Sequence, residues 1–217
     1  MAGEKGQRRV KDKWREKKWF SIMAPNQLGG KEIALSPAVN GEELVGRKVE
    51  VPVSDFTGNF KKSNSKLIFQ VVSCTGLKCS SSFAGHIVSD DYIRRMVRRR
   101  KERLDVITEI KTTDGFTMAL KTVAVTDSKL TATKRAELRE AILTFLNEKT
   151  SNMSFYEFAR YVIGDEIYSN IVDAVRDIYP LKKIEIRRSE LISSGKEAYE
   201  FIEPTDEQKP PEVEPVQ

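Results

Sequence analysis

The stretch LDVITEIKTTDGFTMALKTVAV, residues 104–125, contains two apolar-rich runs that are separated by Asp114-Gly115. Apolar residues that alternate with polar ones are typical of a half-buried strand. Asp-Gly between two such runs indicates a β-hairpin, because the pair accepts the positive φ angles of a tight turn. The stretch therefore predicts two antiparallel strands in a β-rich core.

Other strands are predicted on the N-terminal side of this hairpin. Residues 48–53 alternate between apolar and polar, and Pro52 favours an edge position, because proline has no N–H to donate to a neighbouring strand. Residues 67–72 form a β-branched run that is short enough for a buried strand, and residues 80–88 predict another after a turn at Gly76.

The apolar period changes after Thr131. Apolar residues then recur at helical spacing, which predicts a helix over residues 132–149. A further helix is expected to begin at Ser154 and end at Gly164, and another covers residues 167–178. Residues 181–191 return to a strand pattern, so the fold class is α+β.

The N-terminal arm is basic and contains aromatic residues. Residues 1–18 hold eight Lys/Arg and three Asp/Glu, which predicts a disordered segment that orders only against a partner. Cations beside flat rings suit phosphate neutralisation combined with stacking on unpaired bases. The alternative is a solubilising tail whose tryptophans pack on the protein's own core. The candidate RNA contacts in the arm are Lys11, Lys13, Trp14, Arg15, Lys17, Lys18 and Trp19.

A second basic block covers residues 94–103, with seven Lys/Arg and one acidic residue. Ser89 as N-cap and Asp90-Asp91 in the first turn predict a short helix that ends in this block. Its expected apolar face consists of Tyr92, Ile93, Met96 and Val97. Its candidate RNA contacts are Arg94, Arg95, Arg98, Arg99, Arg100, Lys101 and Arg103. The alternative is that these cations only complement the helix dipole, but one or two would suffice, and seven repel one another without an anionic partner.

The strand expected near residue 184 has a basic face that adds Lys182, Lys183, Arg187 and Arg188 to the RNA-binding candidates. The whole chain carries a net charge of +5. Because the tail at residues 203–217 carries −4, the rest of the chain carries +9. The acidic tail is expected to be disordered and to be repelled by phosphate.

Catalytic constellations are missing from the sequence. His86 is the only imidazole, and no nucleophile elbow or phosphate-binding glycine motif is present, so we expect neither an enzyme nor a bound cofactor. The acidic pairs Asp90-Asp91 and Asp165-Glu166 fit the first turns of helices.

Metal binding and membrane insertion are also not expected. One His and two Cys cannot complete a structural zinc site. Cys74 and Cys79 are expected to be reduced thiols of an intracellular chain. Neither a signal sequence nor an apolar run of membrane-spanning length is found, so a soluble cytoplasmic protein is expected.

Several stretches, in order, closely resemble the eS-one (eS1) family of archaeal and eukaryotic small-subunit ribosomal proteins, also called S-three-A-e (S3Ae). They are KKWFSIMAP at 17–25, GRKVEV with a following Asp at 46–55, FAGH at 83–86, Asp-Val followed by KTTDGF at 111–116, and IYPL with IRR at 178–188.

The resemblance implies a mainly antiparallel, β-barrel-like core with an appended helical region. It also implies a place at the platform of the archaeal small subunit near the mRNA exit. Partners would be the 3′ region of the small-subunit RNA and neighbouring proteins, with mRNA and initiation factors as further candidates. The expected domains are a disordered arm at 1–20, a β-rich core with one inserted basic helix at 21–130, a helical region returning to a basic strand at 131–202, and a disordered acidic tail at 203–217.

Two other functions stay open at this point. A protein-interaction module that docks translation factors on the ribosome would direct its basic blocks at acidic protein surfaces. A nuclease or RNA-modifying enzyme is disfavoured by the missing histidine and acidic clusters. The leading hypothesis is a structural, non-catalytic constituent of the small ribosomal subunit that binds ribosomal RNA.

Overall fold

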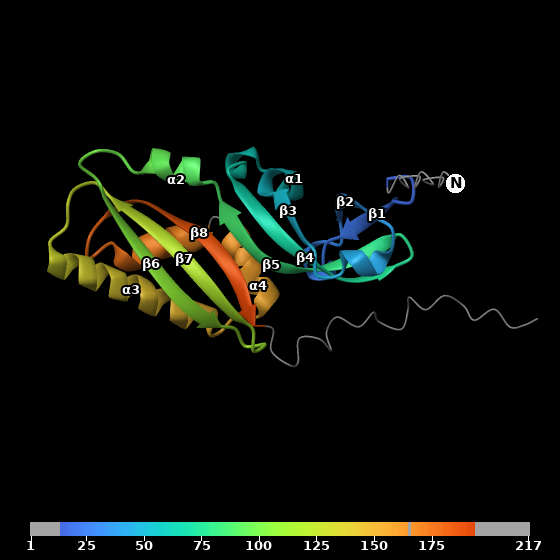
Figure 1. Cartoon of the computed structure of the whole chain (residues 1–217). Coiled ribbons are helices and arrows are strands. Elements are labelled where there is room, and N and C mark those ends of the chain that lie inside the picture. Colours follow the sequence, from blue (N-terminus) through green and yellow to red (C-terminus); the bar gives the residue numbers. More distant parts are fainter. Residues whose placement is uncertain (1–13, 165, 194–217) are drawn as a thin grey trace, which may run out of the picture. The chain divides into compact units, whose positions relative to one another are not determined.

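The protein is described by a computed structural model that covers residues 14–164 and 166–193. It divides into two compact units, Met1–Ile87 and Val88–Gln217. The elements, of which β1–β8 and α1–α4 are labelled in Figure 1, are β1 (Lys18–Met23), η1 (Asn26–Leu28), β2 (Glu32–Ala38), η2 (Gly41–Leu44), β3 (Lys48–Pro52), α1 (Val53–Thr57), η3 (Phe60–Lys62), β4 (Ser65–Thr75), β5 (Lys78–Val88), α2 (Asp90–Met96), β6 (Glu102–Lys111), β7 (Thr117–Thr126), α3 (Ala132–Thr150), α4 (Phe155–Ile163), α5 (Glu166–Val175) and β8 (Leu181–Ser193).

The first unit contains a mixed sheet with the strand order β2-β1-β5-β4-β3. β1 runs antiparallel to β2 and parallel to β5, and β3 runs antiparallel to β4. The core of the sheet is formed by apolar side chains that alternate with exposed ones along the strands. One cluster in this core consists of Phe20, Ile22, Ala38, Leu44, Val71 and Cys79.

Both edge strands of this sheet contain a proline. Pro37 in β2 and Pro52 in β3 lack the N–H that a further strand pairing would use, and the edge position predicted for Pro52 is confirmed. Among the described residues, neither β2 nor β3 has a second strand partner. The sheet of this unit is therefore open, and the barrel-like core that we expected is not confirmed.

β1 corrects the expected boundary of the N-terminal arm. Lys18, Trp19 and Phe20 were expected in a disordered segment, but they begin this strand. The reason is packing, because the Phe20 ring is only 3% exposed and lies in the core cluster. Residues 1–13 of the expected arm lie outside the described residues, as does the tail from residue 203 onward.

The expectation of two reduced thiols is wrong in this structure, because Cys74 and Cys79 form a disulfide. The two residues lie on β4 and β5, the strands on either side of the turn at Gly76. This hairpin brings their Cα atoms to 3.9 Å. The sequence shows only a separation of five residues, which does not reveal that the two cysteines lie opposite each other.

The hairpin predicted over residues 104–125 is confirmed in the second unit. β6 pairs antiparallel with β7, from Glu102 opposite Thr126 to Lys111 opposite Thr117. Gly115 in the turn has a φ of 79°, a left-handed conformation that glycine adopts without strain. β8 pairs antiparallel with β7, which confirms the strand predicted at 181–191.

The helices of the second unit also follow the sequence pattern. α3 covers the predicted range 132–149 and buries Leu138, Ile142 and Leu146. Figure 1 shows this helix running along the β6–β7 hairpin. The change of period after Thr131 thus marks the start of α3, which lies inside the second unit. Together with the strands, these helices confirm an α+β fold.

α4 begins and ends where the sequence predicts. Ser154 accepts a hydrogen bond from the backbone N–H of Glu157, and the Glu157 carboxylate accepts one from the Ser154 N–H, which completes a capping box. The same contacts lower the pKa of Glu157. The Phe155 ring stacks on Phe116 with centroids 4.3 Å apart, so the helix start is fixed to the hairpin turn.

Candidate nucleic-acid interface

The α2 helix is held on the second unit by the apolar face that the sequence predicts. Ile93 is 2% exposed and packs in a cluster with Val88, Val123 and Val125. Tyr92, Met96 and Val97 pack against the same cluster. Asp90 and Asp91 lie in the first turn as expected, although the Ser89 side chain makes no capping hydrogen bond. Because the apolar face is buried, the basic residues that follow point away from the core.

The arginine run of the second block does not continue the helix. α2 ends at Met96, and Arg98, Arg99 and Arg100 form a turn before β6, with the Lys101 N–H donating to the Arg98 carbonyl at 3.2 Å. Arg100 has a φ of +68° and is the one non-glycine residue with positive φ in the described part of the chain. Such a conformation in a bulky residue is uncommon and persists where the surroundings or a function require it.

The three arginines of this turn are exposed. None of their side chains forms an ion pair or hydrogen bond with the residues that the structure describes. We call Arg98, Arg99 and Arg100 the arginine turn. Their guanidinium groups are available to an external anion without breaking an internal contact.

Lys101 and Lys182 share one carboxylate beside the arginine turn. The Nζ atoms of Lys101 and Lys182 lie 2.8 and 3.7 Å from Oδ1 of Asp127. The hydrogen bond from Lys101 lowers the pKa of Asp127 and raises that of Lys101. The pKa of Lys182 is lowered by its hydrogen bond with Lys101 and by the charge of that neighbour, and Arg98 adds to the effect. Cations are therefore crowded at this end of the unit.

β8 and α2 are joined by polar contacts. The Lys183 ammonium lies 4.6 Å from the centre of the Tyr92 ring and also donates to its hydroxyl, while that hydroxyl donates to Glu185 at 3.0 Å. Burial raises the pKa of Tyr92. Burial opposes the charge of Lys183, but the contacts with Tyr92 and Glu185 outweigh it and raise the pKa of this lysine. Arg187 pairs with Asp90 at 2.9 Å, so the structure brings β8 and the N-terminal turn of α2 together.

The remaining candidates of this unit mostly have partners in the chain. The ion pairs are Arg94 with Asp91, Arg103 with Asp105, and Arg188 with Glu190. Arg95 donates to the Asp91 carbonyl at 3.3 Å. The sequence predicted all of these basic residues as RNA contacts without distinction, whereas the structure distinguishes those that have a partner in the chain from those that do not. The arginine turn, together with Arg95, is the part whose charge no carboxylate compensates in the described residues.

In the first unit, the aromatic candidates are exposed. Trp14 is 65% and Trp19 61% exposed, and the Lys17 ammonium lies 4.2 Å from the centre of the Trp14 ring. The alternative that these tryptophans pack on the protein's own core is therefore wrong. Arg15 and Lys18 are exposed as well. Lys11 and Lys13 lie outside the described residues.

Sequence reasoning missed two features, one in each unit. The sequence did not reveal the role of Asp127, because a single acidic residue after a strand looks the same whether it pairs with lysines or is only solvated. Phe60 lies in a lysine-containing loop and is 84% exposed. An aromatic residue beside consecutive lysines, the pattern used for the arm, would have found it at Phe60-Lys61-Lys62.

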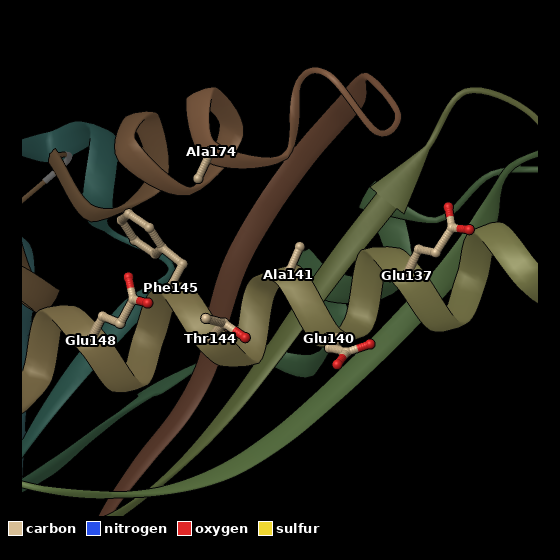
Figure 2. Close-up of a pocket in the computed structure, with 7 residues that line it drawn as sticks. All are labelled: Glu137, Glu140, Ala141, Thr144, Phe145, Glu148 and Ala174. Carbon is tan, nitrogen blue, oxygen red and sulfur yellow. The ribbon is translucent and has the colours of Figure 1, made fainter.

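A shallow groove on the second unit has the opposite charge. It lies between α3 and α5, has a volume of about 540 Å³, and is drawn in Figure 2. Figure 2 shows Phe145 pointing from α3 toward Ala174 of α5. The groove is lined by Glu137, Glu140, Ala141, Thr144, Phe145, Glu148 and Ala174. Three carboxylates make this α3 groove unsuited to phosphate.

The described residues contain no group of three His, Cys, Asp or Glu side chains that could hold a metal ion. His86 is buried in β5, as expected for a strand residue. Glu166 lies in the first turn of α5, and Asp165 lies outside the described residues. In the described part of the chain, no helix is long and apolar enough to cross a membrane.

Comparison with known proteins gives extensive matches. The profile of the Ribosomal S3Ae family matches residues 5–195. The chain is 57% identical over 190 residues to small ribosomal subunit protein eS1 of Picrophilus torridus, covering 88% of this chain and 90% of that protein. It is 51% identical over 205 residues to the eS1 protein of Thermoplasma acidophilum, covering 94% and 95%.

A more distant relative carries the same name. The eS1 protein of Sulfurisphaera tokodaii is 34% identical over 185 residues, which cover 85% of this chain and 96% of that protein. All these relatives are archaeal and are named as ribosomal proteins, a class without catalytic activity, so the expectation of a non-enzyme is confirmed. The resemblance drawn from the sequence motifs is confirmed too, and the chain belongs to the Ribosomal S3Ae family.

Proposed function

We propose that this protein is a structural constituent of the small ribosomal subunit in the cytoplasm and that it binds ribosomal RNA through its arginine turn. The names of its relatives support the ribosomal assignment. The observation that carries RNA binding is the set of three exposed arginines without a carboxylate partner in the described residues. Uncompensated cations close together are stable when they meet an anion such as the phosphate backbone.

The shape of the turn supports phosphate contact. The turn places three consecutive exposed guanidinium groups close together, each of which can donate two parallel hydrogen bonds to a phosphate. The surrounding cations of α2 and β8 are paired internally but keep the neighbouring surface polar and charged. Such contacts fix position on RNA without reading its sequence.

Trp14 and Trp19 provide a second mode of contact in this proposal. Both rings are exposed, and Lys17 lies against one of them. Exposed rings beside cations can stack on unpaired bases while the cations neutralise the flanking phosphates.

The proposal also gives the protein a place and neighbours. It binds the 3′ region of the small-subunit RNA at the platform near the mRNA exit, beside other small-subunit proteins. mRNA and initiation factors are further candidate partners at that place. Chemical crosslinking of intact subunits followed by mass spectrometry tests this part, and crosslinks confined to the opposite side of the subunit would contradict it.

Sedimentation tests the function as a whole. Small subunits are washed in high salt and sedimented, with and without ribonuclease treatment. We expect the protein to remain with the subunits through the wash and to be released when the RNA is digested, because RNA provides its main contacts. The alternative, a module that docks translation factors through acidic protein surfaces, predicts that the protein stays with its protein partners after digestion.

A further inference from the structure

Phe60 is the most exposed of the large apolar side chains in the described residues. It is 84% exposed, and the next values are 67% for Ile107 and 65% for Trp14. A ring left in water on a folded unit loses the stabilisation that burial would give. The nearby Phe56 shows the contrast, because its ring packs against Phe69 with centroids 5.8 Å apart.

The backbone around Phe60 is well fixed. α1 is capped by Gly58, which has a φ of 75° and whose N–H donates to the Ser54 carbonyl at 2.8 Å. The next turn is closed by the N–H groups of Lys62 and Ser63, which donate to the carbonyls of Asn59 and Phe60 at 3.2 Å each. These hydrogen bonds restrict the backbone of the loop, so less backbone freedom is lost when a partner binds the ring.

The chemistry around the ring favours a nucleic-acid partner. Residues 58–66 contain three lysines and no acidic residue. The sequence neighbours of Phe60 are Asn59, Lys61, Lys62 and Ser63, so this stretch offers no further apolar side chain on which a protein partner could build a dry contact. A single flat ring among cations fits an unpaired base with a phosphate on either side.

We propose that Phe60 is a stacking platform for an unpaired base of RNA and that the lysines at positions 61 and 62 neutralise the adjoining phosphates, since Lys66 is already paired with Glu50 at 3.0 Å. This inference rests on the proposed RNA-binding function, but it uses a loop of the first unit and is independent of the arginine turn. Stacking on an aromatic ring contributes about 1–3 kcal/mol per base, so removing the ring weakens binding by roughly 5- to 150-fold.

The test measures binding of a single-stranded RNA of about 12 nucleotides, within the usual range of single-strand site sizes, to full-length protein. Phe60→Ala and Phe60→Leu are both expected to lower the affinity, because leucine is apolar but cannot stack as a ring does. Phe60→Trp is expected to keep it. Ile107→Ala removes another exposed apolar group and is the matched control, with no change expected. The same RNA with abasic positions should bind wild type and Phe60→Ala equally.

The outcomes separate the two proposals. If wild type binds no RNA, both fail. If wild type binds RNA and substitution of the arginine turn weakens it, while Phe60→Ala has no effect, only the stacking inference is overturned. Equal affinity of Phe60→Leu and wild type would show an apolar contact in place of stacking. If Phe60→Ala leaves the RNA affinity unchanged but lowers incorporation of the protein into small subunits, Phe60 contacts a protein. That result would also overturn the inference.

Discussion

The arginine turn and the α3 groove lie in the same unit and carry opposite charges. Each presents three exposed, like-charged side chains, Arg98, Arg99 and Arg100 in the turn and Glu137, Glu140 and Glu148 in the groove. Neither set forms an ion pair within the residues the structure describes, whereas Lys101, Lys182 and Arg187 do. Phosphate is attracted by the first set and repelled by the second, so the charge of the arginine turn suits an RNA contact and that of the groove does not.

The two sets lack partners for different reasons. The residues four positions from each glutamate of α3 are Thr, Ala or Asn, and the one cation at helical pairing distance, Lys134 three residues before Glu137, forms no ion pair with it in the described residues. Beside the arginine turn, Asp127 is already engaged by Lys101 and Lys182. Charge without compensation therefore arises from local spacing in the groove and from competition for one carboxylate at the turn.

The largest expected effect comes from the packing that supports the turn. Ile93→Ala leaves a cavity under α2, where this side chain meets Val88, Val123 and Val125, and should lower the free energy of unfolding by about 2–5 kcal/mol. Urea unfolding measures it. Ile107→Ala, at an exposed position of β6, serves as control and should change stability by less than about 0.5 kcal/mol. Equal losses of unfolding free energy in the two variants would show that burial of the Ile93 side chain does not hold α2 on the unit.

A smaller effect is expected from the strained backbone of the turn. Arg100→Gly relieves the positive φ and should raise the free energy of unfolding by about 1 kcal/mol, while the loss of one charge weakens RNA binding. The free energy of unfolding should therefore rise while the RNA affinity falls. Arg99→Gly is the control, which lowers RNA affinity without gaining stability. If Arg100→Gly leaves RNA binding unchanged, this arginine is not a phosphate contact.

The smallest expected effect is a pH dependence near the turn. The Leu130 N–H donates to the Glu102 carboxylate at 2.6 Å, and this bond, with the charge of Arg135, lowers the pKa of Glu102 from 4.5. A carboxyl group whose pKa is lowered by folding stabilises the fold above its unfolded pKa and loses this contribution as the pH falls. Unfolding in urea should therefore become easier below about pH 4.5, and Glu102→Gln should reduce that dependence.

Local signals of the sequence predicted most elements of the fold. The Asp114-Gly115 hairpin, the capping box at Ser154 and the edge position of Pro52 follow from turn, capping and proline chemistry that acts over a few residues. The Cys74–Cys79 disulfide was not predicted, because it depends on the register of the strands around Gly76.

The candidate site was predicted only as a list of basic residues. Which of them remain uncompensated depends on acids far away in the chain, such as Asp90 for Arg187, 97 residues apart, and Asp127 for Lys101, 26 residues apart. These pairs require the tertiary arrangement of α2, β7 and β8. The sequence therefore predicted a positively charged surface, and the structure shows which of its basic residues have a carboxylate partner among the described residues.

We propose that the arginine turn, and not the α3 groove, meets RNA phosphates. The most direct test of this proposal is the slope of log affinity against log salt concentration for single-stranded RNA with three proteins: wild type, Arg98→Ala/Arg99→Ala/Arg100→Ala, and Glu137→Gln/Glu140→Gln/Glu148→Gln. Loss of three phosphate contacts should reduce the slope by about 2 to 3 and the affinity by roughly 100-fold, while the glutamine variant behaves as wild type. An unchanged slope in the alanine variant would contradict the account.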